Sequence, residues 1–597
     1  MNQKRSFYRV VVGFILLITP ILAFGQFRVE NETRSNLNIC FENPNFEIKQ
    51  EMIGANEYDY VSSETLTVTV DVGSPELPFY SSTIEIPNSG NATINVEVIE
   101  SRQIKDVNIK PFRENELELL TFNNNVYSKN VVYPQDIVRI GEPAIFRNKR
   151  VVSFIIQPFR YNDATKVLEV IEKANIEISF DNTPSVNEIT RSTMKPTQEF
   201  EQFFASTFLN YKAPENRDDY QNPTILYIYP QAIHANPIME GLFKWRREQG
   251  WIVHTASTSV TGTSTSSVKS YIQTAYNTWE NPPAFVTFIG DGHGSLIVPS
   301  YTGYPGGDHD YALLEGSDEL EDVFLGRLSI EDTTQLATVV AKTIKYEKAT
   351  TVPDSTYFNR VLLVADDQPS GQSTIIVSHY IKEAMKAYNN DFTFTEMYGN
   401  NINPSQISGS LNSGMNFWNY RGYISMDGWG ASQANSLSNV NKLAITVILT
   451  CSTGTFYSET CITESILRAG SSASPTGGVC SIGMATSGTH TAFNNCLNGG
   501  IMGHLFQEDG WTMGGATNRG KFHLWQAYAI SKSSKVRDFS IMCNLMGDSS
   551  LRVYKGIPKT LTAQHLENVP AGTNQIKITT KENGEILPNI WVTLNVN

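Results

Sequence analysis

The sequence has few cysteines, no excess of positive charge and, after its first 24 residues, no long apolar run. Six cysteines in 597 residues are too few for a small disulfide-bonded scaffold. No later stretch approaches the about 20 consecutive apolar residues that a membrane-spanning helix needs. A formal net charge of −14 disfavours nucleic acid and anionic membranes as main partners. We therefore expect no membrane span and no nucleic-acid partner.

Two families of catalytic motif are also missing. The chain has no His-Glu-x-x-His sequence and no closely spaced cysteine pairs, so we expect no zinc site. No Gly-x-Ser-x-Gly elbow follows an expected strand, which disfavours a serine hydrolase. The chemistry must come from other residues.

The N-terminus has the composition of a secretory signal peptide. Lys4, Arg5 and Arg9 precede an apolar run over 10–24. Ala23 and Gly25 provide the small residues that a signal peptidase reads. We expect a signal peptide over 1–25 with cleavage before Gln26. The mature protein is then expected to be secreted or held at the cell surface.

The length predicts several domains, and the first of them is all-β. Over 26–206 apolar and polar residues alternate with period two, which predicts strands at 65–72, 92–99, 151–156 and 174–180. From 181 to 222 the chain is polar, which indicates an exposed segment open to proteolysis, interrupted by a short helix at 198–209. We assign 207–223 as the linker.

The region 224–556 changes to alternating strands and helices, which predicts a mostly parallel α/β domain. The expected strands are 224–229, 251–255, 284–290, 323–328, 361–365, 392–397, 415–423, 443–450 and 478–485. The expected helices are 237–249, 266–279, 333–348, 374–388, 462–469, 494–507 and 516–531.

The last segment, 557–597, returns to a β pattern. Strands are expected at 561–565, 575–581 and 590–596, with a tight turn at Asn583-Gly584. So few strands cannot close a sandwich. Either this is the start of an immunoglobulin-like module, or the chain is cut short.

Two apolar strands in the α/β domain end in residues suited to chemistry. The first ends near Gly422, and the second ends in Cys451, followed by a glycine-containing turn. In parallel sheets, functional residues collect where strands end at their carboxyl edge. Cys451 is therefore a candidate nucleophile, with backbone N–H groups around 422–424 and 451 as a candidate oxyanion hole.

Five landmarks in order carry a family resemblance over 224–554. They are a strand ending in Gly-Asp at 285–291, an acidic segment ending Val-Phe-Leu-Gly-Arg at 318–327, Asn-Tyr-Arg-Gly at 419–422, Cys451, and Gly-Asp-Ser-Ser-Leu at 547–551. This pattern resembles the gingipain-type cysteine peptidases, whose fold is similar to that of caspases. The resemblance implies an endopeptidase with protein or peptide substrates and no required cofactor. The β domain resembles the family's propeptide, which implies a precursor; an accessory β-sandwich that stays attached is the alternative.

The chain departs from the family at the expected general base. Tyr423 occupies the position of the family's histidine, and Ile424 replaces the glycine after it. A phenol is a poor base near neutral pH, so we expect Tyr423 to line the substrate site with Gly422 and Trp429.

Three histidines follow expected strands and could replace the missing base. His490 follows the strand after the one that ends in Cys451, and His309 lies between two aspartates. We take His490 and His309 as the catalytic candidates, with His293 in reserve. With no base at all, the chain would be an inactive homologue acting as a surface binding or adhesion protein. Transpeptidation by the same cysteine is a third alternative.

Asp318 matches an aspartate that contacts a basic substrate side chain in arginine-specific relatives. The resemblance therefore implies cleavage after Lys or Arg. The surrounding acidic cluster has two other interpretations, a solvated loop or a structural Ca²⁺ site, because carboxylates suit that ion.

The five cysteines between 451 and 543 also leave two interpretations open. An odd number fits one free catalytic thiol plus up to two disulfides. Equally, all five could be reduced, buried and apolar in character.

Overall fold

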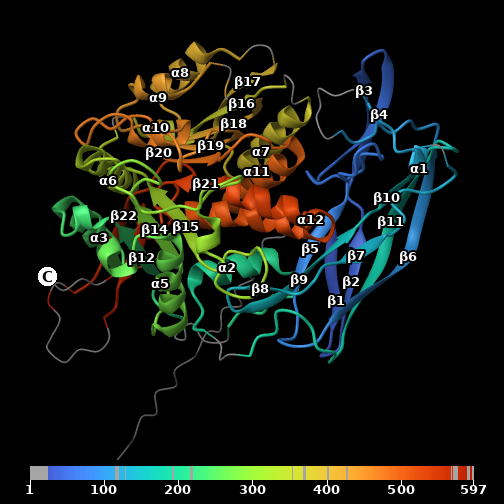
Figure 1. The fold of residues 1–597 in the computed structure, drawn as a ribbon, viewed down its shortest axis with the longest axis horizontal. Helices are drawn as coiled ribbons and strands as arrows, with labels where there is room; N and C mark the ends of the chain where they lie inside the picture. The colour runs from blue at the N-terminus through green and yellow to red at the C-terminus, as the bar shows by residue number, and fades with distance from the viewer. Residues whose placement is uncertain are drawn as a thin grey trace, which may run out of the picture.

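We describe the protein from a computed structural model of the 597-residue chain. The described residues are 25–113, 120–127, 129–190, 194–214, 220–352, 354–367, 371–399, 402–424, 426, 428–566, 568, 576–587, 590 and 592–593, without the side chains of Tyr423 and Ile424. The apolar segment of the expected signal peptide lies outside them. Figure 1 shows an N-terminal β body beside a larger α/β body, with helix α12 between them.

The N-terminal body contains a five-stranded sheet, a four-stranded sheet and a two-stranded hairpin. The five-stranded sheet comprises β1 (Phe27–Glu32), β2 (Asn36–Glu42), β6 (Ala92–Lys105), β10 (Phe159–Asn162) and β11 (Val167–Phe180). The four-stranded sheet comprises β5 (Tyr80–Glu85), β7 (Val138–Ile140), β8 (Ala144–Phe146) and β9 (Lys149–Ile156). The hairpin joins β3 (Phe46–Ile53) to β4 (Asn56–Ser63), and α1 (Asn124–Tyr127) is a single turn.

One expected strand of this body is wrong. Residues 65–72 do not form a ladder; their one bridge joins Val68 to Pro78. Thr67 and Thr69 use their hydroxyls to bind the carbonyls of Phe79 and Pro75. Two backbone bonds, from Thr69 N–H to Leu77 and from Phe79 N–H to Thr67, complete this bridge, so the segment pairs over a single bridge and does not extend into a strand.

The α/β body is built on one ten-stranded sheet, ordered β13-β12-β14-β15-β21-β20-β19-β18-β16-β17. Its strands are β12 (Thr224–Tyr229), β13 (Ile252–Ser257), β14 (Phe285–Ile289), β15 (Phe324–Leu328), β16 (Arg360–Ala365), β17 (Thr393–Tyr398), β18 (Phe417–Ile424), β19 (Ala444–Cys451), β20 (Gly478–Met484) and β21 (Cys543–Met546). All neighbours pair in parallel except β20 and β21. The sheet is therefore mixed, with two internally parallel halves that meet at one antiparallel joint.

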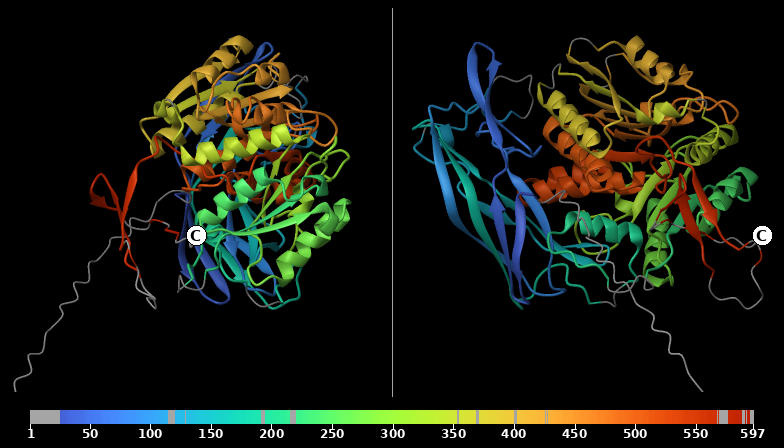
Figure 2. Two further views of the ribbon diagram at one scale, coloured as in Figure 1. Left: turned by 90° about the vertical axis from the view of Figure 1, so that its left-hand side faces the viewer. Right: turned by 180° about the vertical axis from the view of Figure 1, so that it is seen from behind.

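The helices cover both faces of this sheet (Figure 2). They are α3 (Pro237–Glu248), α4 (Thr258–Thr261), α5 (Thr265–Thr278), α6 (Thr333–Lys348), α7 (Ser373–Tyr388), α8 (Pro404–Ser413), α9 (Ala431–Asn435), α10 (Ile462–Arg468), α11 (Thr491–Phe506) and α12 (Met513–Met542), with 3-10 turns η2 (Gln231–Ile233), η3 (His309–Tyr311) and η4 (Ser355–Asn359). The alternation expected from the sequence is present. Helices α8 and α9 and strand β21 were not predicted, and α12 is longer than expected.

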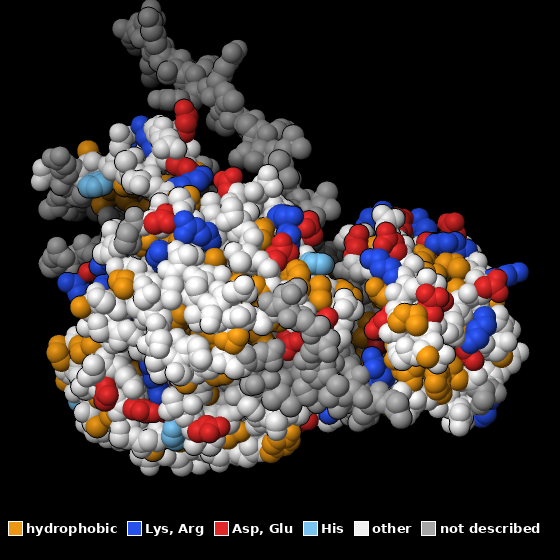
Figure 3. All heavy atoms as spheres, turned by 90° about the horizontal axis from the view of Figure 1, so that it is seen from above, with side chains coloured by type: hydrophobic (Ala, Val, Ile, Leu, Met, Phe, Trp, Pro, Cys, Tyr) orange, Lys and Arg blue, Asp and Glu red, His pale blue; other side chains and the backbone are white. Residues whose placement is uncertain are grey.

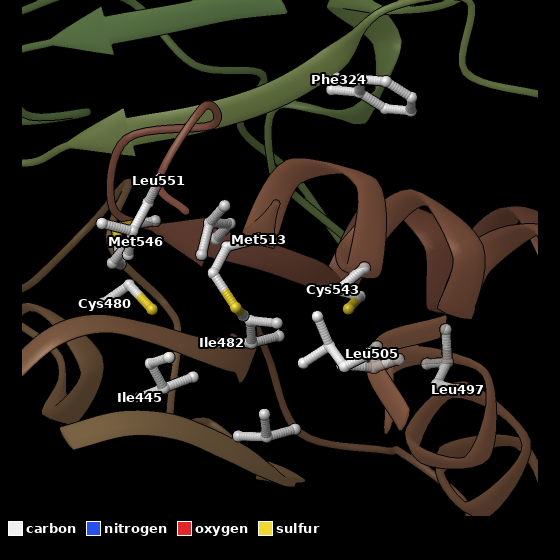
Figure 4. Packing of buried hydrophobic residues seen from close by; sticks show 14 of the residues in the cluster. Phe324, Ile445, Cys480, Ile482, Leu497, Leu505, Met513, Cys543, Met546 and Leu551 are labelled. Atoms are coloured by element: carbon white, nitrogen blue, oxygen red, sulfur yellow. The ribbon is translucent and has the colours of Figure 1, made fainter. Parts of the chain in front are cut away.

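Helices α11 and α12 form a core with the strands of the antiparallel joint. Ile445, Cys480 and Ile482 point from their strands toward Met513 and Leu505 of the two helices (Figure 4). Helix α11 is buried along nearly its whole length, so even its polar residues lie inside the protein. The start of α11, which lies next to Cys451, is therefore held in place by the packing of the helix.

The expected exposed segment before the α/β domain contains a buried helix instead. Helix α2 (Gln198–Thr207) turns Phe200, Phe203 and Phe204 into the contact with Phe146 of β8. Phe200 also stacks on Phe324 of β15, with ring centroids 4.3 Å apart. The helix prediction is confirmed, and its apolar face joins the two bodies. Residues 191–193 and 215–219 of this segment lie outside the described residues.

The C-terminal segment contains one small sheet formed by β22 (Leu561–Gln564), β23 (Thr579–Glu582) and β24 (Glu585–Ile586). The Asn583-Gly584 turn is confirmed: both residues have positive φ, 48° and 90°, as a two-residue hairpin requires. Strand β24 follows the turn directly, whereas most of the strand expected at 590–596 lies outside the described residues. The immunoglobulin-like module stays a prediction.

Charges of both signs are interspersed on the face shown in Figure 3. Within the part of the chain that the structure describes, no helix combines the length and the apolar character needed to cross a bilayer.

Candidate active site

Strands β18 and β19 bring Gly422 and Cys451 to the same edge of the sheet. They pair in parallel from Phe417–Ile445 to Arg421–Leu449, and a bulge then places Ile424 opposite Cys451. A Cβ on Gly422 would lie 2.8 Å from Cε1 of the buried Tyr420, so a side chain here would force that ring to move. The two predicted strand ends therefore do meet.

Cys451 is 2% exposed, and its sulfur contacts the hydroxyl of Thr489. The Sγ–Oγ1 distance is 3.0 Å. Thr489 in turn lies 3.1 Å from Nδ2 of Asn494, in the first turns of α11. The immediate contact of the candidate nucleophile is thus a hydroxyl that a helix holds in place.

The turn after Cys451 does not offer the free N–H groups that the sequence suggested. The N–H of Ser452 donates to the carbonyl of Thr486 at 2.8 Å, and that of Gly454 donates to Met484 at 3.0 Å. Both donors hold the turn against the end of β20. An oxyanion hole at 422–424 and 451 stays a prediction.

His490 caps helix α11 and contacts the N-terminal body. Its Nδ1 accepts the N–H of Ala492 at 3.0 Å, and its Nε2 lies 3.2 Å from the carbonyl of Arg113. The ring packs on Phe112, with centroids 5.2 Å apart. Because Nδ1 accepts, the neutral ring carries its proton on Nε2. His490 directly follows Thr489, the residue that contacts the sulfur, but the contacts of its own ring are these three, with Ala492, Arg113 and Phe112.

His309 lies in a different environment, fully buried among carboxylates. Its Nδ1 is 2.8 Å from Glu321, which Lys521 also contacts, and its Nε2 is 3.5 Å from Glu319. The preceding residue, Asp308, binds Asn544 of β21 through its N–H. Strand β20 therefore separates this site from β19. The contacts of His309 join it to a charged network and not to Cys451.

Asp318 faces the N-terminal body. Its Oδ2 accepts the N–H of Ile145 at 2.8 Å and lies 3.3 Å from Nδ2 of Asn187, while Oδ1 accepts the N–H of Leu320. Burial raises the pKa of the Asp318 carboxyl to about 7. The neighbouring acidic residues of the predicted cluster are held by arginines: Asp308 by Arg327, and Asp310 with Glu319 by Arg537.

Trp429 is a core residue at this end of the sheet. Its indole is 2% exposed, packs edge-on against Trp418 at 4.8 Å and donates to Ser408. The side chain of Tyr423, the other predicted lining residue, lies outside the description. All six cysteines are free and buried, which matches the reduced interpretation.

One group of described side chains has the donor set for a cation. Asp291, His293 and Glu331 present ligand atoms within 4.8 Å of one another. Arg468 already binds Asp291 and Glu331, at 2.8 and 3.0 Å. The guanidinium thus supplies the positive charge that these carboxylates need, and a structural Ca²⁺ stays a prediction.

A comparison with protein families decides what this arrangement belongs to. The profile of peptidase family C25 matches residues 218–554, more than half of the chain, and the profile of the C25 propeptide matches 31–217. The chain belongs to peptidase family C25. It is a cysteine-type endopeptidase of the gingipain type, made as a precursor.

Known C25 peptidases are similar over most of this chain. Gingipain R2 of Porphyromonas gingivalis is 25% identical over 86% of the chain and 72% of the relative. A Lys-gingipain of the same organism is 24% identical over 83% of the chain and 31% of the relative. The crystal structure of the Arg-specific cysteine proteinase gingipain R has a TM-score of 0.56 at 21% identity, covering 63% of the chain and 87% of that structure. The complex of the P. gingivalis RgpB pro- and mature domains has a TM-score of 0.55 at 21% identity, covering 60% and 87%. This C25 chain therefore shares the gingipain fold.

Sequence reasoning missed the contact of Thr489 with the cysteine, and the two side chains, Asn494 and Arg421, that bind the carbonyl of Leu449. The guanidinium of Arg421 is fully buried and donates to the carbonyl of Leu449 and to Oδ1 of Asn495. The asparagines at 494, 495 and 498 were the available signal, because buried amides on a helix need hydrogen-bond partners.

Proposed function

We propose that this C25 chain is a secreted endopeptidase precursor in which Cys451 attacks peptide bonds that follow Lys or Arg. The observation that carries the proposal is the position of Cys451. It lies at the carboxyl end of a buried parallel strand, 3.0 Å from a hydroxyl at the start of α11. A rigid strand end is where a nucleophile can be held in a fixed orientation. Residues 4–24 support export, because they have the pattern of a signal peptide.

The preference for a basic residue before the cleaved bond is assigned to Asp318. Relatives include an Arg-specific proteinase and Lys-gingipains by name. In the precursor, donors of the N-terminal body occupy Oδ2 of Asp318. Removal of that body would leave the Asp318 carboxylate without these donors. A guanidinium or ammonium group of a substrate could then bind it. Substrates would then contact Asp318 only after maturation.

His490 is the proposed general base. It is next to the residue that contacts the sulfur, whereas His309 is held by two glutamates. In the precursor both ring nitrogens of His490 have partners, one of them a carbonyl of the N-terminal body. Loss of that body would release Nε2. Taking the thiol proton would then also require the ring to give up its bond to Ala492.

The test is hydrolysis of a peptide panel by the processed protein, with Lys, Arg and neutral residues before the cleaved bond. Activity on Lys or Arg peptides that disappears in Cys451→Ala supports the function. His490→Gln should lower the rate by about 10²–10⁴-fold, the usual contribution of a positioned base. Asp318→Asn should reduce the preference for basic residues and leave cleavage of neutral ones unchanged. Equal rates on all peptides would contradict the specificity.

An inactive homologue that binds other proteins is the second candidate. The 2% exposure of Cys451 and the two occupied nitrogens of His490 favour it. A processed protein that hydrolyses no peptide, while Cys451 alkylates no faster than the other cysteines, would establish this second function.

A further inference from the structure

We propose that the hydroxyl of Thr489 donates a hydrogen bond to Sγ of Cys451, and that Asn494 is the positioning residue that fixes this direction. The inference rests on the proposed role of Cys451 as nucleophile. It goes beyond that role by naming the group that favours the reactive thiolate form. A hydrogen bond donated to a charged atom stabilises its charged form.

The direction follows from the atoms around Asn494. Its Nδ2 lies 3.4 Å from the carbonyl of Leu449, which can only accept, so the amide must present its nitrogen on this side. The same nitrogen lies 3.1 Å from Oγ1 of Thr489 and donates to it. A lone pair of Oγ1 is then occupied, and its hydrogen is left for the sulfur at 3.0 Å.

The opposite amide orientation is disfavoured, because it would bring Oδ1 of Asn494 against the carbonyl oxygen of Leu449. In the orientation described, Oδ1 is buried and has no hydrogen-bond partner in the part of the chain that the structure describes. The Asn494 amide is thus held by the two hydrogen bonds that its Nδ2 donates. Arg421 reinforces it, because the guanidinium binds the same Leu449 carbonyl.

A second cysteine–threonine pair in the same protein has the reverse direction. Sγ of Cys461 lies 3.1 Å from Oγ1 of Thr463, but this hydroxyl donates to the carbonyl of Thr453 at 3.1 Å. Its hydrogen is already used, so the thiol of Cys461 must be the donor. Burial, followed by the charge of Glu464, raises the pKa of Cys461 well above its ordinary value. The raised pKa of Cys461 comes from burial and Glu464, whereas the difference proposed between the two pairs is the direction of the hydroxyl hydrogen.

The experiment measures the second-order rate of alkylation of each cysteine by iodoacetamide between pH 6 and 9, by peptide mass spectrometry on the full-length protein. Thr489→Val keeps the shape and removes the hydroxyl. We expect Cys451 to react about 10-fold more slowly at neutral pH in this variant, because the thiolate loses a donated hydrogen bond; this factor corresponds to about 1.4 kcal/mol. Thr489→Ser should restore the rate to within about threefold.

The matched control is Thr463→Val, which should leave the alkylation of Cys451 unchanged. If Thr489→Val fails to fold, as seen by thermal unfolding, Asn494→Ala tests the same hydrogen bond and should also slow Cys451. An unchanged Cys451 rate in folded Thr489→Val or Asn494→Ala overturns the inference.

The failure of the inference differs from a failure of the proposed function. If wild type hydrolyses peptides but Thr489→Val alkylates normally, Cys451 is the nucleophile and Thr489 has no part in it. If Thr489→Val slows alkylation but the processed wild type hydrolyses nothing, the hydrogen bond is real and the peptidase function is wrong.

Discussion

The two halves of the ten-stranded sheet use polar residues in different ways. In the half with β14, β15 and β21, buried polar groups are paired: Arg327 with Asp308, and Glu321 with both His309 and Lys521. In the half that ends in Cys451, the sulfur's contact is the neutral hydroxyl of Thr489. Fully paired charges stabilise a fold but are not available to a substrate. The comparison therefore favours the Cys451 half for chemistry and assigns His309 a structural role.

The largest effect expected from this comparison is on activity. Cys451→Ala should reduce peptide hydrolysis by at least about 10⁴-fold, because no other group can form the acyl-enzyme bond. The matched control is Cys543→Ala, a buried cysteine at the start of β21 in the other half. It should cost about 1–2 kcal/mol of stability and retain the activity of folded protein. Equal losses in the two variants would contradict the assignment of chemistry to one half.

The next effect is on stability in the other half. Asp308→Asn breaks a buried bidentate pair whose two N–O distances to Arg327 are both 2.8 Å. Removing one partner of a buried ion pair costs about 3–5 kcal/mol, because the other charge is left uncompensated. Urea unfolding monitored by circular dichroism should show this loss. A cost below about 1 kcal/mol would show that the pair does not support this half of the sheet.

A smaller effect concerns pH at the contact between the bodies. Burial raises the pKa of Asp318 to about 7 from its ordinary value of 3.8. The precursor therefore binds a proton there more tightly than the unfolded chain does. This contribution to stability is complete below about pH 4 and is lost as pH rises through about 7.

The measurement is urea unfolding of the precursor at pH 5 and pH 8, for wild type and Asp318→Asn. Wild type should lose about 2–3 kcal/mol more than the variant over this interval, since about two pH units below the folded pKa are crossed and each corresponds to about 1.4 kcal/mol. Identical pH dependence in the two proteins would show that Asp318 does not contribute to the pH dependence of stability.

The smallest effect is expected from Asp310→Asn, two residues from the buried pair. Its partner Arg537 is 43% exposed, and such ion pairs contribute at most about 1 kcal/mol. Unfolding in low and in 1 M salt should show a difference from wild type only at low salt. A loss as large as that of Asp308→Asn would show that burial does not separate the two pairs.

The sequence predicted the elements of the α/β domain well, because buried parallel strands and their crossover helices have strong periodic patterns. The expected strand at 224–229 and helix at 333–348 match β12 and α6 residue for residue. The expected strand at 65–72 failed because this segment pairs only through one bridge, between Val68 and Pro78, with threonine hydroxyls binding the carbonyls on either side. The helix expected at 198–209 is present as α2, but no local pattern showed that its phenylalanines pack on residues distant in the chain.

In the candidate site, too, some residues could be predicted from the sequence and others could not. The motif residues Gly422 and Cys451 could be found from strand ends and family landmarks, since both features are local. Thr489 and Asn494 could not, because they follow Cys451 by about forty residues and meet it only when α11 packs on the sheet. The positions of Asp318 and Trp429 also depended on packing partners that no local pattern names.

By itself, the sequence determined the order of the domains, the two strands that meet at Cys451 and the membership in family C25. These features depend on local periodicity and on short motifs, which are written in consecutive residues. Only the tertiary structure decided that the sheet reverses at β20 and β21, that His309 is paired with glutamates, and that a threonine contacts the sulfur. Such features depend on which distant segments are brought within hydrogen-bond distance, and that is settled by the packing of the whole chain.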